Sequence, residues 1–200
     1  MVARWLWDYL LLAAGLALLV LLVLVAALAL GWNSPRPEGP PDWEAQTLPL
    51  RINAEPDRPA SDLLGPVARD FTFEAIMSPE RLPESRLVDY GLIYRAQDPG
   101  NYYVLLVGAD GYYAVAKEEA GQTTYLSPWQ QFPHIRRGLA SNRLLVSCAG
   151  VACSFRVNDE YVVTVEDDQW LSGKPGVAAR SPDGEAAVTL LRASLWLSEE

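Results

Sequence analysis

The chain has 200 residues, half of which are hydrophobic, and its formal net charge is −9. This acidity argues against nucleic-acid binding, because phosphates require a basic surface. It also disfavours a polybasic role at a membrane surface. One histidine and two cysteines are too few for the usual multi-ligand zinc or iron sites. We therefore expect no metal and no cofactor.

The first element in chain order is an uncharged apolar run from Tyr9 to Gly31. Roughly 23 residues at about 1.5 Å each give a helix of about 34 Å, enough for a hydrocarbon core of about 30 Å. Trp7 and Trp32, near its two ends, suit the two headgroup layers. The run predicts a transmembrane helix over residues 9–32, through which the chain would contact a membrane.

A cleaved signal peptide is the alternative, since Ala27-Leu28-Ala29 provides an A-x-A-like site. Its apolar region is usually only about 7–15 residues long, which favours an uncleaved anchor. The positive-inside rule gives only a weak indication of the orientation of this helix, because one arginine lies near each end of the run. The amino terminus favours N-inside. Residues 1–8 would then be a short cytoplasmic tail, and the protein a single-pass cell-membrane protein with its C-terminal domain outside.

A proline-rich segment follows, "NSPRPEGPPDW". Such segments adopt extended conformations and act as semi-rigid spacers, so we predict a linker over residues 33–47. Residues 48–200 then form one extracellular domain. Near its beginning, "SDLLGPVARD" (residues 61–70) predicts a short helical turn.

From Phe71 onward the pattern is that of strands. Short runs rich in Val, Ile, Tyr, Phe and Thr recur between Gly, Pro, Asn and Asp, which is typical of an all-β sandwich. One run, "YYVLLV", is apolar at every position, so its strand is either covered on both sides or binds something on one face. The predicted strands are FTFEAIM, YGLIYRA, YYVLLVG, YYAVAKE, TTYL, RLLVSC, CSFRV, YVVTVE, GVAAR and AAVTLLRASLWL.

Two corners between these runs, Asp98–Asn101 and Ala109–Gly111, carry turn residues. A calcium site is the alternative function for their aspartates, but calcium needs about six to eight converging oxygens. One aspartate per corner does not supply them. We therefore predict hairpin turns and a three-stranded meander.

Tyrosines are concentrated in the strands after these corners. Aromatic faces with a few polar groups can form a carbohydrate groove. Alternatively, one tyrosine of each YY pair points into the core and the other supports cross-strand packing. If there is a contact surface, we expect it to be formed by Tyr94, Arg95, Tyr103, Tyr112 and Trp129.

Cys148 and Cys153 flank the four-residue segment "AGVA" of a predicted hairpin. Counting by twos places both on the same face and opposite each other, so a disulfide can close the hairpin outside the cell. Two buried thiols are the alternative.

Catalytic signals are weak. His134 has no neighbouring nucleophile motif. The acids of "VEDDQW" (residues 165–170) are consecutive and point in alternating directions, whereas glycoside hydrolysis needs two carboxylates facing one cleft. Catalytic residues are therefore not assigned.

Several of these motifs, taken in order, resemble the concanavalin A-like lectin/glucanase superfamily, in particular its laminin-G-like and 3-keto-disaccharide hydrolase-like modules. The resemblance extends from about Asp70 to Leu197. It implies a two-sheet antiparallel jelly roll with its first and last strands paired. The E-x-D-x-E strand of the glucanases is absent, so the resemblance does not carry an activity over. The motifs are Gly91–Arg95, Asp98–Tyr103, Gly111–Tyr113, Asn142–Leu144, Phe155–Asn158 and Gly173–Val177.

Three functions are compatible with these features. The first is a non-catalytic, membrane-anchored module that binds a glycan or an envelope protein outside the cytoplasm. The second is a saccharide-acting hydrolase of the same fold. The third is a structural or sensory ectodomain that contacts another membrane protein. A nucleic-acid partner is not expected.

Overall fold

The structure, a computed structural model, describes residues 2–29, 37, 39–56, 59–85 and 87–198. The chain divides into two compact units, residues 1–36 and residues 37–200.

The first unit contains a single long helix, α1 (Val2–Ala29). It begins before the predicted span and includes most of the predicted tail. No helix in the described part of the chain is long and apolar enough to cross a membrane. Residues 30–36, which include the end of the predicted span and the start of the predicted linker, lie outside the described residues.

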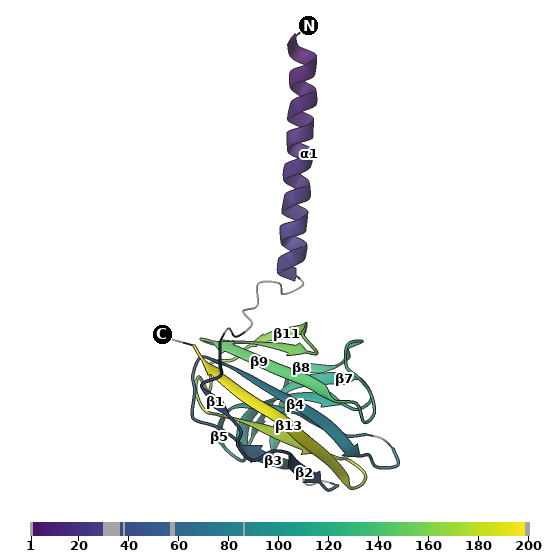
Figure 1. The fold of residues 1–200 in the computed structure, drawn as a ribbon, viewed down its shortest axis with the longest axis vertical. Helices are drawn as coiled ribbons and strands as arrows, with labels where there is room; N and C mark the ends of the chain where they lie inside the picture. Colours follow the sequence, from purple (N-terminus) through teal and green to yellow (C-terminus); the bar gives the residue numbers. More distant parts are fainter. Residues whose placement is uncertain (1, 30–36, 38, 57–58, 86, 199–200) are drawn as a thin grey trace. The chain divides into compact units, whose positions relative to one another are not determined.

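The second unit is an all-β sandwich of two antiparallel sheets, as the sequence predicts (Figure 1). The seven-stranded sheet has the order β1-β13-β4-β9-β10-β11, and β2 also pairs with β13. The six-stranded sheet has the order β3-β12-β5-β6-β7-β8. The strands are β1 (Trp43–Glu44), β2 (Leu50–Ala54), β3 (Ala60–Leu63), β4 (Phe71–Arg81), β5 (Asp89–Asp98), β6 (Asn101–Gly108), β7 (Tyr112–Glu119), β8 (Gln122–Gln131), β9 (Asn142–Ala149), β10 (Ala152–Val157), β11 (Glu160–Glu166), β12 (Lys174–Arg180) and β13 (Ala186–Leu197).

Every run that was predicted as a strand lies within one of the strands β4 to β13. The first three strands were not predicted. The helical turn predicted over residues 61–70 is wrong, because Ala60–Leu63 form the edge strand β3, which pairs with β12. Backbone hydrogen bonds to that neighbour outweigh the weak local preference of "SDLL" for a turn.

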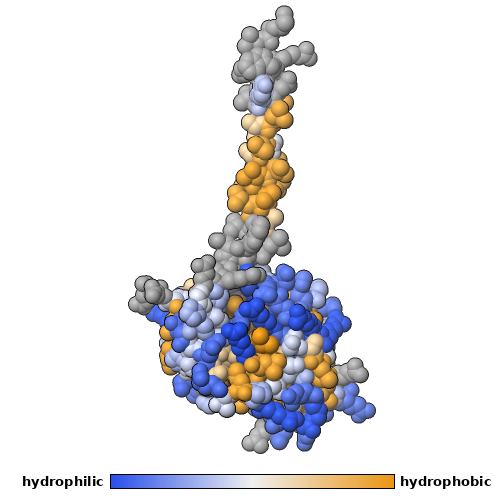
Figure 2. Space-filling view, viewed as in Figure 1, coloured by the Kyte–Doolittle hydropathy of each residue, from blue (hydrophilic) through white to orange (hydrophobic). Residues whose placement is uncertain are grey.

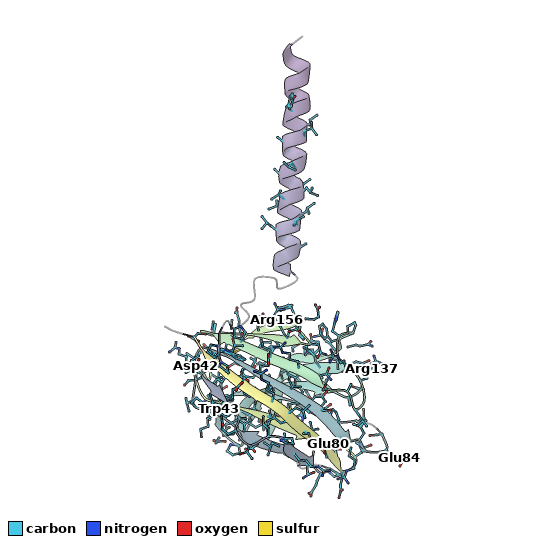
Figure 3. The ribbon with its side chains drawn as sticks, viewed as in Figure 1. Asp42, Trp43, Glu80, Glu84, Arg137 and Arg156 are labelled. Carbon is cyan, nitrogen blue, oxygen red and sulfur yellow. A yellow bond between two sulfur atoms is a disulfide. The ribbon has the colours of Figure 1, made fainter. Side chains whose placement is uncertain are left out.

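The two ends of the sandwich domain meet at β13. Phe71 of β4 pairs with Leu197 of β13, as expected for paired first and last strands. On the other side of β13, Trp43 of β1 pairs with Leu195 of β13, although β1 lies in the segment predicted as a linker. The backbone N–H of Asp42 donates a hydrogen bond to Leu195 O at 2.9 Å, and Asp42 Oδ2 accepts one from the N–H of Leu197 at 2.8 Å. Figure 3 shows Asp42 and Trp43 beside the end of β13.

The main core lies between the two sheets. Alternate residues of each strand enter it, for example Phe71 and Phe73 from β4 and Leu105 and Val107 from β6. Tyr102, Val104 and Leu106 of β6 are also buried, but they belong to a separate cluster on the outer face of the six-stranded sheet. The strand is therefore covered on both sides, which explains its unbroken apolar sequence.

The hairpin predictions agree with the structure. Cys148 and Cys153 pair across β9 and β10 and form a disulfide, with their Cα atoms 4.1 Å apart. Both side chains lie in the main core. At the first acidic corner, Asp98 Oδ1 accepts the backbone N–H of Gly100 at 2.7 Å. At the second, Asp110 Oδ1 accepts the N–H of Tyr112 at 3.3 Å, so both aspartates support turns.

Candidate ligand-binding groove

A groove lies on the outer face of the six-stranded sheet. The second apolar cluster lies on the same face; it is built mainly from small and aliphatic side chains of four adjacent strands, and Leu63 and Trp129 pack against it. Its residues are buried, and of them only Tyr102 lines one of the hollows described below. The cluster residues are Ile93, Ala96, Tyr102, Val104, Leu106, Ala116 and Ala178.

Three hollows follow one another along this face, and neighbouring hollows share lining residues. The central hollow has a volume of about 350 Å³. It shares Asp89 and Trp129 with a hollow of about 250 Å³ beside Tyr112, the Tyr112 hollow. It shares Pro59 and Arg180 with a hollow of about 470 Å³ beside Tyr102, the Tyr102 hollow. Together these three hollows form the groove, and the two larger ones have volumes in the usual range of about 300–1,000 Å³ for small-molecule sites.

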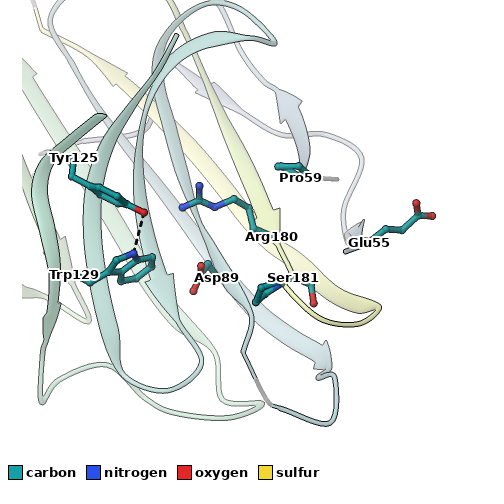
Figure 4. A pocket seen from close by; sticks show the side chains of 8 residues that line it. Glu55, Pro59, Asp89, Tyr125, Trp129, Arg180 and Ser181 are labelled. Atoms are coloured by element: carbon teal, nitrogen blue, oxygen red, sulfur yellow. Dashed lines mark hydrogen bonds between the residues drawn. The ribbon is translucent and has the colours of Figure 1, made fainter. Parts of the chain in front are cut away.

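An aromatic pair forms one wall of the central hollow. Trp129 Nε1 donates a hydrogen bond to the hydroxyl of Tyr125 at 3.3 Å, which fixes the two β8 side chains against each other. Figure 4 shows this pair on one side, with Arg180 and Asp89 facing it from β12 and β5. A polyhydroxylated ring could fit between the two sides: its C–H groups would pack on the aromatic rings, and its hydroxyls would bind the cation and the carboxylate.

Two carboxylates converge at the Tyr112 hollow. A Cβ atom built on Gly108 would lie 2.3 Å from Asp110 Oδ1 and 3.4 Å from Asp89 Oδ1, so both carboxylates flank the same point. The pKa of Asp89 is raised to about 6, chiefly by burial; Arg180 opposes this rise and the charge of Asp110 adds to it. Within the described residues, no side chain donates a hydrogen bond to Asp89. This carboxylate is therefore available to a ligand hydroxyl.

An ion pair separates the central hollow from the Tyr102 hollow. Arg180 Nη1 on β12 lies 3.2 Å from Glu118 Oε1 on β7. The hydroxyl of Thr123 also lies 2.9 Å and 2.8 Å from the two carboxylate oxygens of Glu118, which holds this carboxylate in place. Both charged side chains are mostly buried, at 22% and 13% exposure. Burial raises the pKa of Tyr102 beneath them, and the charge of Glu118 raises it further.

The structure brings two of the five predicted contact residues into this groove. Tyr112, which is 40% exposed, and Trp129 both line the Tyr112 hollow. Tyr94 and Tyr103 instead point into the main core, where their rings stack with centroids 5.1 Å apart. The YY pair of β6 thus divides between the two faces, with Tyr102 outside and Tyr103 inside.

Arg95 is buried too, at 1% exposure. Its Nη2 donates to the carbonyl of Gly150 at 2.6 Å and to the carbonyl of Arg69 at 3.2 Å, and it lies 3.9 Å from Asp70 Oδ1. Burial lowers the pKa of this guanidinium, whereas Asp70 raises it. These contacts tie together three segments of the sandwich and leave the side chain inaccessible to a ligand.

The other catalytic candidates lie elsewhere. Asp167 of the "VEDDQW" segment accepts hydrogen bonds from the Tyr103 hydroxyl and, at 3.2 Å, from Lys117 Nζ. Burial raises its pKa, but these bonds and one from the Gln169 N–H lower it, and the net direction is downward. His134 is exposed and packs on Phe132. Neither Asp167 nor His134 lines the three hollows. The described residues contain no group of acids, histidines or cysteines that could hold a metal ion.

Sequence reasoning missed Asp89, Arg180, Glu118 and Tyr125 as groove residues. Asp89 and Arg180 are paired across β5 and β12, but they are far apart in the chain, and only the sheet order reveals their proximity. For Tyr125 a signal was available, because Tyr125 and Trp129 are four apart on one strand and therefore share a face.

Comparisons with known proteins support the fold. Neither a protein-family model nor a curated protein matches the sequence. Among solved structures, the carbohydrate-binding module CBM66 of Bacillus subtilis superimposes with a TM-score of 0.60 at 18% identity, covering 76% of this chain and 91% of that one. The GH43B protein of a Bacteroides ovatus xyloglucan locus gives 0.53 at 12% identity, covering 75% of this chain and 33% of that one. Human galectin-16 gives 0.50 at 12% identity, covering 76% and 97%. These likenesses are consistent with a concanavalin A-like sandwich, and at such identities they establish the fold alone.

Proposed function

We propose that this protein is a glycan-binding module and that it binds saccharide in the groove on the outer face of the six-stranded sheet. The observation that carries the proposal is the central hollow, where Tyr125 and Trp129 face Arg180 and Asp89. Aromatic faces pack on the C–H side of a sugar ring, and the charged groups accept from and donate to its hydroxyls. The carbohydrate-binding function of the similar Bacillus subtilis module supports the same class of ligand.

Binding of the full chain in detergent to an array of neutral and charged oligosaccharides, followed by calorimetric titration, tests the proposal. Trp129→Ala should weaken binding by tenfold or more, because it removes the main aromatic wall of the central hollow. Tyr112→Ala should weaken it less, since that ring lines only the Tyr112 hollow.

Two variants serve as controls. Tyr161→Ala removes a tyrosine from β11, in the opposite sheet, and should leave binding unchanged. Tyr103→Phe alters only a core hydroxyl and should also bind normally. If the array shows no saccharide binding, or if Trp129→Ala binds as well as the unmodified chain, the proposed site is wrong.

No helix among the described residues is by itself long and apolar enough to cross a membrane. From the full apolar run of the sequence we nevertheless propose that residues 9–32 anchor the module in a cell membrane, with the sandwich outside. Two features support this. The segment from Tyr9 to Gly31 is uncharged. All described side chains of α1 between Leu11 and Ala26 are exposed, and Figure 2 colours this part of the helix almost wholly hydrophobic. Such a surface would be unstable in water but stable in lipid.

Alkaline carbonate extraction of membranes tests the anchor, and external protease tests the orientation. The chain should stay in the membrane pellet, and the sandwich should be cleaved in intact cells. Leu18→Arg combined with Leu22→Arg places two charges in the middle of the apolar run and should release the protein. A chain that is extracted by carbonate without these changes would contradict the anchor.

A saccharide hydrolase is a second candidate, and one observation favours it. Asp89 and Asp110 flank the same point, and the pKa of about 6 for Asp89 suits a general acid. Release of reducing ends from any bound oligosaccharide, abolished by both Asp89→Asn and Asp110→Asn, would support hydrolysis. Binding without turnover over hours would leave the module non-catalytic.

A further inference from the structure

The described lining of the groove includes one cation, and that cation is already paired. Among the described residues that line the three hollows, Arg180 is the only basic side chain. Its guanidinium lies 3.2 Å from Glu118, and the two side chains reach each other over β5 and β6. The positive charge that would otherwise attract an anionic ligand is therefore neutralised inside the protein.

Glu118 is held in this position. The hydroxyl of Thr123 lies within 2.9 Å of both of its carboxylate oxygens. Because only 13% of the side chain is exposed, its charge is screened weakly by solvent. An acidic ligand would have to compete with a fixed intramolecular carboxylate for Arg180.

The other charged groups that face the hollows are acidic. Asp89 lines the central hollow and the Tyr112 hollow, and Asp110 lines the latter. Glu55 stands at the far edge of the central hollow (Figure 4). At neutral pH the carboxylates of Asp89 and Asp110 repel a carboxylate or sulfate on a sugar, but they can accept hydrogen bonds from uncharged hydroxyls.

We propose that the groove selects uncharged saccharides over acidic ones and that Glu118 sets this selectivity by occupying Arg180. This inference rests on the proposed function of the groove and adds the class of ligand. Glu118 acts here as a specificity-determining residue.

The test is a titration of the full chain with two oligosaccharides of equal length and linkage, one neutral and one made of the corresponding uronic acid, at pH 7.5. The unmodified chain should prefer the neutral oligosaccharide by tenfold or more. Glu118→Gln keeps the shape of the side chain but frees the charge of Arg180, so the preference should fall by about tenfold, mainly through tighter binding of the acidic oligosaccharide. That gain should disappear in high salt, because it is electrostatic.

Glu119→Gln is the matched control. It removes the same charge from the next residue of β7, whose carboxylate accepts a hydrogen bond from Gln169 and does not line the hollows. The neutral-to-acidic preference should be unchanged in this variant.

A second variant keeps the test decisive if Glu118→Gln alone folds poorly. In Arg180→Gln combined with Glu118→Gln, the described lining of the groove no longer includes a cation, and the preference for the neutral oligosaccharide should return. Thermal unfolding of each variant shows whether the fold is retained.

The outcomes separate the two proposals. Binding of neither oligosaccharide overturns the proposed function, and this inference falls with it. Binding that favours the acidic oligosaccharide overturns the inference but leaves glycan binding intact. A preference that is equal in the unmodified chain and in Glu118→Gln also overturns the role of Glu118.

Discussion

Asp89 and Arg180 occupy paired positions on the neighbouring strands β5 and β12, at the rim of the groove. Although a cation lies beside it, the pKa of Asp89 is raised from 3.8 to about 6, because burial outweighs the attraction of Arg180 and because Asp110 adds repulsion. The protonated form of Asp89 is thus favoured in the folded domain relative to the unfolded chain.

This relationship predicts a pH-dependent effect of Asp89→Asn. Because the folded domain favours protonated Asp89, this carboxyl group contributes to the free energy of unfolding. That contribution is fully present below about pH 4 and is lost as the pH rises through 6. Asn carries no charge, so the variant should gain stability relative to the unmodified chain over this interval. After allowance for solvent screening, the gain should be on the order of 1–2 kcal/mol. Urea unfolding at several pH values between 4 and 7 measures it.

Asp98→Asn is the matched control for that experiment. The pKa of Asp98 is lowered, first by the hydrogen bond from Asn101 Nδ2 and then by the N–H of Gly100. The contribution of ionised Asp98 to stability is present above about pH 4 and is lost as the pH falls. Relative to the unmodified chain, Asp98→Asn should therefore become less stable as the pH rises, which is opposite to Asp89→Asn. A difference between Asp89→Asn and the unmodified chain that stays constant with pH would show that burial does not perturb Asp89.

Tyr103→Phe should lower stability without affecting the groove. The Tyr103 hydroxyl donates to the Asp167 carboxylate at the edge of the main core. Its loss leaves a partly buried carboxylate with one donor fewer, which should cost about 1–3 kcal/mol in urea unfolding at pH 7. The net pKa of Asp167 is lowered, so this cost should shrink as the pH falls below about 4 and Asp167 becomes protonated.

Tyr94→Phe provides a close comparison, because Tyr94 stacks on Tyr103. The Tyr94 hydroxyl is buried and has no hydrogen-bond partner among the described residues. Removing it should leave stability unchanged or slightly increased. Equal losses in the two variants would mean that the bond to Asp167 contributes nothing specific.

Gly91→Ala should destabilise the sandwich strongly. A Cβ at this position would lie 1.7 Å from the carbonyl oxygen of Leu105 on the neighbouring strand β6. Because this oxygen belongs to the backbone, the strands must move apart, at a cost of about 3 kcal/mol or more. At Gly100 the nearest atom would be 3.5 Å away, so Gly100→Ala should be tolerated. Thermal unfolding of both variants distinguishes a local clash from a general sensitivity to added methyl groups.

The strands β4 to β13 were easier to predict from the sequence than the pairing between strands or the residues of the groove. Runs such as "AAVTLLRASLWL" have strand composition throughout, and turn residues mark their ends, so local information was sufficient. The segment from Trp43 to Leu63 has short, proline-interrupted strands, whose formation depends on pairing with β13 and β12. Local pattern contains no such information.

The groove was less predictable for the same physical reason. The alternation of β6 places Tyr102 and Tyr103 on opposite faces, but the pattern cannot say which face is the core. Arg180 and Glu118 meet over two intervening strands, and that contact requires the sheet order. The aromatic residues of this sheet divide between two roles: Tyr94 and Tyr103 stack on each other in the main core, whereas Tyr112, Tyr125 and Trp129 line the hollows.

The disulfide provides the last prediction. Cys148 and Cys153 close a loop of only six residues, counting both cysteines, between β9 and β10. By the chain-entropy relation, a loop of this size should stabilise the domain by about 2 kcal/mol. The double variant Cys148→Ala with Cys153→Ala should lose about that much in urea unfolding, and reduction of the unmodified chain should have a similar effect. Dithiothreitol should not change the double variant. If the reductant lowers the stability of both proteins equally, or of neither, the bond does not stabilise the sandwich, and the packing of the two side chains beside Phe155 is sufficient to hold the hairpin.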